Sequence, residues 1–130
     1  MLSFSTAIPK HEDQDSVYAW IKEAFPEYDS LRARTAALVE ETCELALAAG
    51  MTIADIRNVV EATFDRVKHQ KEMSIPEESG DVFNCLLALA GQQNFDLQEQ
   101  LEKKMALNRS RPFEYYHKKT QLKKELGLKL

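Results

Sequence analysis

The stretch Thr35–Gly50, TAALVEETCELALAAG, decides how the sequence is interpreted, because it carries Glu40, Glu41 and Glu44 inside an otherwise apolar run. On a helix, at about 100° per residue, these three carboxylates share one sector, while Leu, Val, Cys and Ala cover most of the remainder. A helix that is apolar nearly all round is typical of a buried position. No Lys or Arg occurs from residue 35 to residue 56. The stretch therefore predicts a buried helix whose acids need a counter-charge from elsewhere.

A second acidic segment, PEESGDVFNCLLALA over residues 76–90, has the same character. Glu78 and Asp81 are three residues apart and therefore neighbours on one helix face. No Lys or Arg lies between Lys71 and Lys103. Two such helices facing each other could form a cage of four carboxylates, and carboxylate oxygens are ligands that Mg²⁺ prefers. The simpler alternative is that these acids lie on solvated faces or serve the positive end of a helix dipole.

The chain has 130 residues, of which 44% are hydrophobic and 29% charged, as in an ordinary soluble domain. No segment alternates in the manner of a strand. We predict an all-α bundle of about five helices in a single domain over 1–130, with its core at about 15–112 and a basic C-terminal helix over 112–130. Cap signals place helix starts after Asp15 or Ser16, after Ser30, at Thr52 and at Ser74. Short helices with apolar faces also predict a homodimer or homotetramer.

Charge is unevenly distributed along the chain. Residues 1–102 carry 8 basic and 19 acidic side chains, whereas residues 103–130 carry 9 basic and 2 acidic ones. A basic tail indicates either an anionic ligand or nucleic acid, or a face that packs against an acidic neighbour. Cys43 and Cys85 lie in apolar runs, which predicts two buried thiols in a reducing cytoplasm. No signal sequence or membrane span is recognised, so we expect a cytoplasmic protein without a membrane partner.

The acid pattern resembles that of a known family. E-E-x-x-E from Glu40 to Glu44, followed after a spacer by E-x-x-D from Glu78 to Asp81, is similar to the signature of the MazG-like all-α nucleoside triphosphate pyrophosphohydrolases. The later segment KKMALNRSRP, residues 103–112, strengthens the resemblance, because these proteins often carry Lys, Asn and Arg after the second acid motif. The similarity covers roughly residues 15–112.

The resemblance implies an enzyme that cleaves a nucleoside or deoxynucleoside triphosphate between the α- and β-phosphates. It implies Mg²⁺, with Mn²⁺ as a substitute, as the cofactor. Carried over by position, Glu41, Glu44, Glu78 and Asp81 would be the metal ligands. Glu40 would join Glu41 and Glu44 as a catalytic residue, either by orienting water or by binding a further ion.

The remaining candidates would hold the nucleotide. Lys104, Asn108 and Arg109 lie near one face of a predicted helix, and their side chains suit phosphate oxygens. For the base, Trp20 and Phe25 are the aromatic candidates, although a core or dimer-interface position explains Trp20 equally well.

Other functions also fit parts of the sequence. Phosphoribosyl-ATP pyrophosphatase and the all-α dUTPases also bind metal through carboxylates of this kind, so the acid spacing does not distinguish these activities from the first prediction. A di-iron carboxylate bundle would need two Glu-x-x-His motifs, and the sequence has only one, from Glu114 to His117. A helical interaction or nucleic-acid-binding module would use the basic tail but would leave the acids without a role, and we therefore do not expect a nucleic-acid partner.

Overall fold

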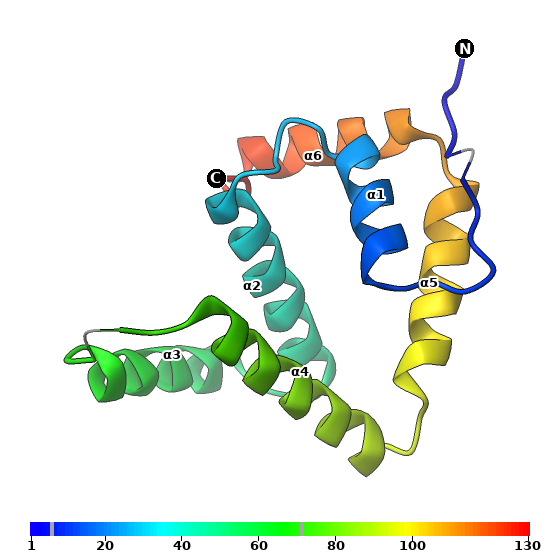
Figure 1. Cartoon of the computed structure of the whole chain (residues 1–130). Helices are drawn as coiled ribbons and strands as arrows, with labels where there is room; N and C mark the ends of the chain where they lie inside the picture. Colours follow the sequence, from blue (N-terminus) through cyan, green and yellow to red (C-terminus); the bar gives the residue numbers. More distant parts are fainter. Residues whose placement is uncertain (6, 71) are drawn as a thin grey trace. The chain divides into compact units, whose positions relative to one another are not determined.

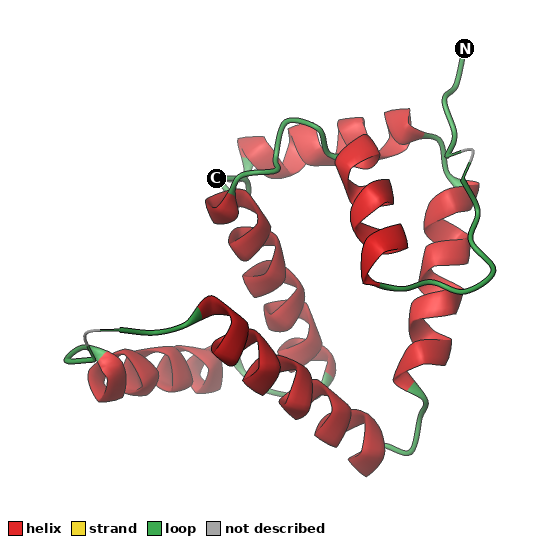
Figure 2. Ribbon diagram, viewed as in Figure 1, coloured by secondary structure: helices red, strands yellow, loops and turns green. Residues whose placement is uncertain are grey.

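The computed structural model describes residues 1–5, 7–70 and 72–130. In this part of the chain all regular structure is helical (Figures 1 and 2), which confirms the all-α class. The described residues form six helices rather than about five. The helices are α1 (Gln14–Ala24), α2 (Leu31–Ala48), α3 (Ile53–Val67), α4 (Ile75–Gln92), α5 (Leu97–Ser110) and α6 (Phe113–Glu125).

Three helix starts follow the cap signals of the sequence. At α2 the Ser30 hydroxyl accepts a hydrogen bond from the Ala33 N–H at 3.1 Å. At α3 the Thr52 hydroxyl accepts a hydrogen bond from the Asp55 N–H at 3.1 Å, and the Asp55 carboxylate accepts one from the Thr52 N–H at 2.9 Å. At α4 the Ser74 hydroxyl accepts from the Glu77 N–H at 3.4 Å. These side chains satisfy N–H groups that a helix leaves without partners in its first turn.

The start of α1 differs from the prediction. Asp13, rather than Asp15 or Ser16, is the cap, and its carboxylate accepts from the Ser16 N–H at 2.8 Å. Ser16 completes the reciprocal arrangement, because its hydroxyl accepts from the Asp13 N–H at 2.9 Å. A cap that satisfies two N–H groups at once favours the earlier start.

The chain divides into two compact units. The first unit comprises Met1–Thr42 and Gln98–Leu130, and the second comprises Cys43–Leu97. The first unit contains the hydrophobic core, in which the Trp20 and Tyr116 rings meet edge to face at 5.0 Å and Phe25 lies 6.0 Å from Trp20. Such edge-to-face pairs are favoured by the ring quadrupoles. The core residues are Trp20, Ala24, Met105, Phe113 and Tyr116.

The second unit is held together differently. Among its described residues, 43–70 and 72–97, Ala90 is the only buried one. Large apolar side chains on α3 and α4, such as Phe64 and Phe83, are exposed. Cys43 is half-buried and Cys85 is exposed, so the prediction of two buried thiols is wrong for Cys85. The apolar run around Cys85 forms the predicted helix, but Val82, Phe83 and Leu87 on it are exposed.

Helix α2 also differs from the expectation of a buried helix. Within Leu31–Ala48 the structure buries only Ala33, and Leu38, Val39 and Leu45 are exposed. In the described residues, no helix has both the length and the apolar character that a membrane crossing requires.

Candidate functional site

The acid stripe of α2, which comprises Glu40, Glu41 and Glu44, receives a counter-charge from the C-terminal helix. Lys123, in the last turn of α6, places its Nζ 2.6 Å from Oε1 of Glu40. Both side chains are largely buried, with 19% of Lys123 and 12% of Glu40 exposed. The pair lies within the first unit. Sequence reasoning anticipated a cation from another helix but did not identify Lys123, because 82 residues separate the two positions.

Further cations gather near the same carboxylates. Burial lowers the pKa of Lys129, the positive charges of Lys123 and Arg34 lower it further, and the acids Glu40 and Glu41 oppose these effects. The Lys129 ammonium also lies 5.7 Å from the centre of the Phe25 ring. The basic tail therefore packs against an acidic neighbour inside the first unit, as one of the two interpretations of its charge predicted.

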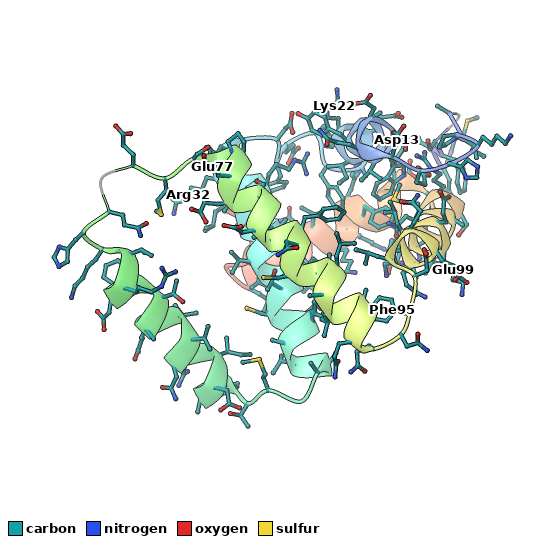
Figure 3. The ribbon with its side chains drawn as sticks, turned by 60° about the horizontal axis from the view of Figure 1, so that its bottom comes forward. Asp13, Lys22, Arg32, Glu77, Phe95 and Glu99 are labelled. Atoms are coloured by element: carbon teal, nitrogen blue, oxygen red, sulfur yellow. The ribbon has the colours of Figure 1, made fainter. Side chains whose placement is uncertain are left out.

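The four predicted metal ligands, Glu41, Glu44, Glu78 and Asp81, are exposed. Glu44 lies one turn beyond Glu40 on α2, while Glu78 and Asp81 lie near the start of α4. Figure 3 labels Glu77, the neighbour of Glu78, in the first turn of α4. Glu77 and Glu78 lie in the first turn of α4, where acids are stabilised by the positive end of the helix dipole. The dipole explanation therefore fits these two acids.

The four-carboxylate cage stays a prediction. Glu41 belongs to the first unit, whereas Glu44, Glu78 and Asp81 belong to the second. In residues 1–5, 7–70 and 72–130, the structure brings together no group of three or more His, Cys, Asp or Glu side chains that could hold a metal ion. The donor chemistry nevertheless suits Mg²⁺, because all four predicted ligands are carboxylates.

Arg109 is held by the N-terminal arm, which we define as the described part of residues 1–12. Its Nε and Nη2 donate to the two carboxylate oxygens of Glu12 at 3.1 and 2.7 Å. Nη1 donates to the Ser5 hydroxyl and the Ala7 carbonyl, both at 3.0 Å, and Nη2 donates also to the Ser16 carbonyl at 3.3 Å. All five N–H groups of the guanidinium thus have acceptors. Phosphate binding by Arg109 would require Glu12 to leave.

Glu12 was missed by sequence reasoning, although it is among the most buried charged side chains. Only 5% of it is exposed, against 7% of Arg109. The hydrogen bonds from Arg109 hold the pKa of Glu12 below its usual range, and this effect exceeds the opposing effect of burial. Gln98 and Glu102 of α5 also bind its backbone, at 2.8 and 2.7 Å. The arm passes along α5 in Figure 1. No spacing rule links residues that are 97 positions apart.

The two other phosphate candidates have different surroundings. Lys104 is exposed on α5. Asn108 is half-buried, and its side-chain oxygen accepts from the Tyr116 hydroxyl at 3.0 Å. Lys104, Asn108 and Arg109 all lie on α5, but the side chains of Asn108 and Arg109 are already engaged in tertiary contacts.

The two aromatic candidates for base binding, Trp20 and Phe25, differ in burial. Trp20 is 4% exposed and belongs to the core, which is the structural alternative that the sequence left open. Trp20 also lines a cavity of about 220 Å³, together with Ile8, Pro9 and Arg109. Phe25 is half-buried and lines a cavity of about 220 Å³ in the first unit, together with Tyr28, His117 and Gln121. Both candidates therefore lie beside a cavity of the first unit.

Comparisons with protein-family models, with curated proteins and with solved structures found no match to this chain.

Proposed function

We propose that the chain is a Mg²⁺-dependent hydrolase of MazG type, which cleaves a nucleoside or deoxynucleoside triphosphate into the monophosphate and pyrophosphate. One observation carries the proposal: both acid motifs lie on helices, with two carboxylates at i, i+3 on α2 and two on α4. Carboxylates paired in this way on two helices are a donor set for a hard divalent cation. Mn²⁺ is expected to substitute.

The residues have distinct roles in this proposal. Glu41, Glu44, Glu78 and Asp81 would hold the metal, which when bound neutralises phosphate charge and lowers the pKa of a bound water. Glu40 would be an auxiliary acid that either orients water or binds a further ion. Lys104, Asn108 and Arg109 would bind the phosphates, for which Glu12 would have to release Arg109. Phe25 and Trp20, each beside a cavity, would be the candidates for contact with the base.

The proposal also includes the oligomeric state and the cellular compartment of the protein. The exposed apolar side chains of α3 and α4 support a homodimer or homotetramer, because large apolar patches on a water-soluble surface mark interaction sites. The exposed free thiol of Cys85 supports a reducing compartment such as the cytoplasm.

Pyrophosphate release from a panel of dNTPs, NTPs and phosphoribosyl-ATP, with Mg²⁺ or Mn²⁺, tests the activity. We expect Glu44→Gln and Asp81→Asn to lower kcat/KM by about 100-fold or more, because a metal ion contributes several kcal/mol of charge stabilisation. The matched control is Glu61→Gln, an exposed carboxylate on α3 outside both motifs, which should retain parental activity. Absence of turnover with every nucleotide would refute the enzyme proposal.

The same panel separates the alternatives. Preference for phosphoribosyl-ATP or for dUTP would assign the chain to one of the two related activities. A helical interaction or nucleic-acid-binding module would instead show salt-sensitive binding to DNA or RNA without turnover. Under that alternative, Glu44→Gln and Asp81→Asn should leave Mg²⁺ binding unchanged when measured by titration calorimetry.

A further inference from the structure

The Glu40–Lys123 pair joins the acid stripe of α2 to the C-terminal helix. It is short, at 2.6 Å, and it is mostly shielded from water. Charge-assisted hydrogen bonds of this kind are among the stronger ones in proteins, and partly buried charges are screened less by salt than exposed ones. Lys124 lies in the same last turn of α6 and is exposed, so only one of the two adjacent lysines is engaged in this way.

The position of the pair connects it to the proposed metal ligands. Glu40 directly precedes Glu41 and lies one turn before Glu44, and all three share one sector of α2. The sequence predicts that this sector requires a cation. For Glu40 that cation is the ammonium group of Lys123. A divalent ion that uses the same carboxylate oxygen must displace Lys123 and lose the energy of the pair.

We propose that Lys123 is an internal counter-ion that competes with a divalent cation for Glu40, so that the C-terminal helix regulates cation loading of the acid stripe. This inference rests on the proposed function, because it assumes that the stripe binds a metal. In the absence of the ion, Lys123 neutralises Glu40 and ties α6 to α2. An ion held by the stripe would take Glu40 as a ligand, and the Lys123 ammonium would then be free to move to solvent or to a substrate phosphate.

Titration calorimetry with Mg²⁺ and with Mn²⁺ on the full chain tests the competition. Lys123→Met keeps the length of the side chain and removes the charge, and Lys124→Met is the matched control. We expect Lys123→Met to bind the ion about tenfold more tightly, as removal of one partly buried competing pair implies. Lys124→Met should stay within about twofold of the parent. Equal or weaker binding by Lys123→Met would overturn the inference.

A second measurement needs no variant and therefore does not depend on how Lys123→Met folds. The parent protein is labelled briefly with acetic anhydride, and the acetylation of each lysine is quantified by mass spectrometry with and without saturating Mg²⁺. We expect the ion to raise the reactivity of Lys123 severalfold and to leave that of Lys124 unchanged. Unchanged reactivity of Lys123 in a protein that binds Mg²⁺ would exclude release of the ammonium.

The outcomes also separate this inference from the proposed function. If the parent binds Mg²⁺ and hydrolyses a nucleotide while Lys123→Met behaves like Lys124→Met, the proposed function stands and the counter-ion role fails. If neither the parent nor Lys123→Met binds Mg²⁺ or Mn²⁺, both fail.

Discussion

The two units of this chain are stabilised by different kinds of interaction. In the first unit, a cluster of Trp20, Met105 and Tyr116 excludes water, and the Arg109–Glu12 pair lies almost fully buried. In the described residues of the second unit only Ala90 is buried, and α3 contributes none. The first unit therefore depends on contacts between residues distant in sequence, whereas the second depends on signals within each helix.

The comparison shows that a helical sequence pattern determines where a helix starts but not whether its apolar side chains become buried. The cap residues Thr52 and Ser74 act on backbone groups three residues away, so the start of each helix is a local matter. Isolated helices of about 15 residues are nevertheless marginal in water. The helices of the second unit thus gain order from capping and leave apolar side chains such as Phe64 exposed.

The largest effect is expected for Trp20→Ala. Removing the central ring of the first unit leaves a cavity among Phe25, Tyr116 and Met105, and loss of a buried aromatic side chain costs about 3–5 kcal/mol. Urea unfolding followed by circular dichroism measures the change. Tyr18→Ala, an exposed aromatic position on the same helix, is the control and should cost about 1 kcal/mol or less. Equal costs for the two variants would show that the cluster is not the stabilising core.

An intermediate effect is expected for Glu12→Gln. At neutral pH the substitution keeps the shape of the side chain but removes the charge that Arg109 binds, and hydrogen bonds to charged groups contribute about 1.5–3 kcal/mol. Glu23→Gln, which changes an exposed carboxylate on α1, should leave the free energy of unfolding nearly unchanged. A cost for Glu12→Gln no larger than that for Glu23→Gln would mean that the arm is not held through this pair.

The same pair predicts a dependence on pH. The pKa of Glu12 is lowered in the folded protein, chiefly by the hydrogen bonds from Arg109, so the folded state binds this proton less readily than the unfolded state. Its contribution is complete above the pKa of the unfolded carboxyl and is lost as pH falls through the lowered pKa of the folded state. The stability difference between the parent and Glu12→Gln should therefore shrink on acidification. A difference that stays constant with pH would contradict this account.

The sequence predicted the local parts of this structure and missed the distant ones. Helix class and the caps at Thr52 and Ser74 follow from short patterns, and they are confirmed. The partners of Arg109 and Glu40 could not be predicted, because Glu12 and Lys123 are brought to them only by the folded path of the chain. For the same reason, the acid spacing predicts which carboxylates could bind a metal ion but not whether the fold brings them together.

The smallest effect, and the one that examines the second unit most directly, is expected for Thr52→Ala. The substitution removes the hydroxyl that accepts from the Asp55 N–H, while the Thr52 backbone N–H, which is the main cause of the lowered pKa of Asp55, is kept. Loss of a Thr cap costs about 1 kcal/mol, so amide hydrogen exchange within α3 should accelerate about fivefold. Thr63→Ala is the matched control, because the Thr63 hydroxyl donates to the Val59 carbonyl at 2.7 Å, a bond that α3 does not require. If Thr63→Ala accelerates exchange as much as Thr52→Ala, local capping does not explain the order of α3, and the contrast between the two units would have to be sought in contacts made with another chain.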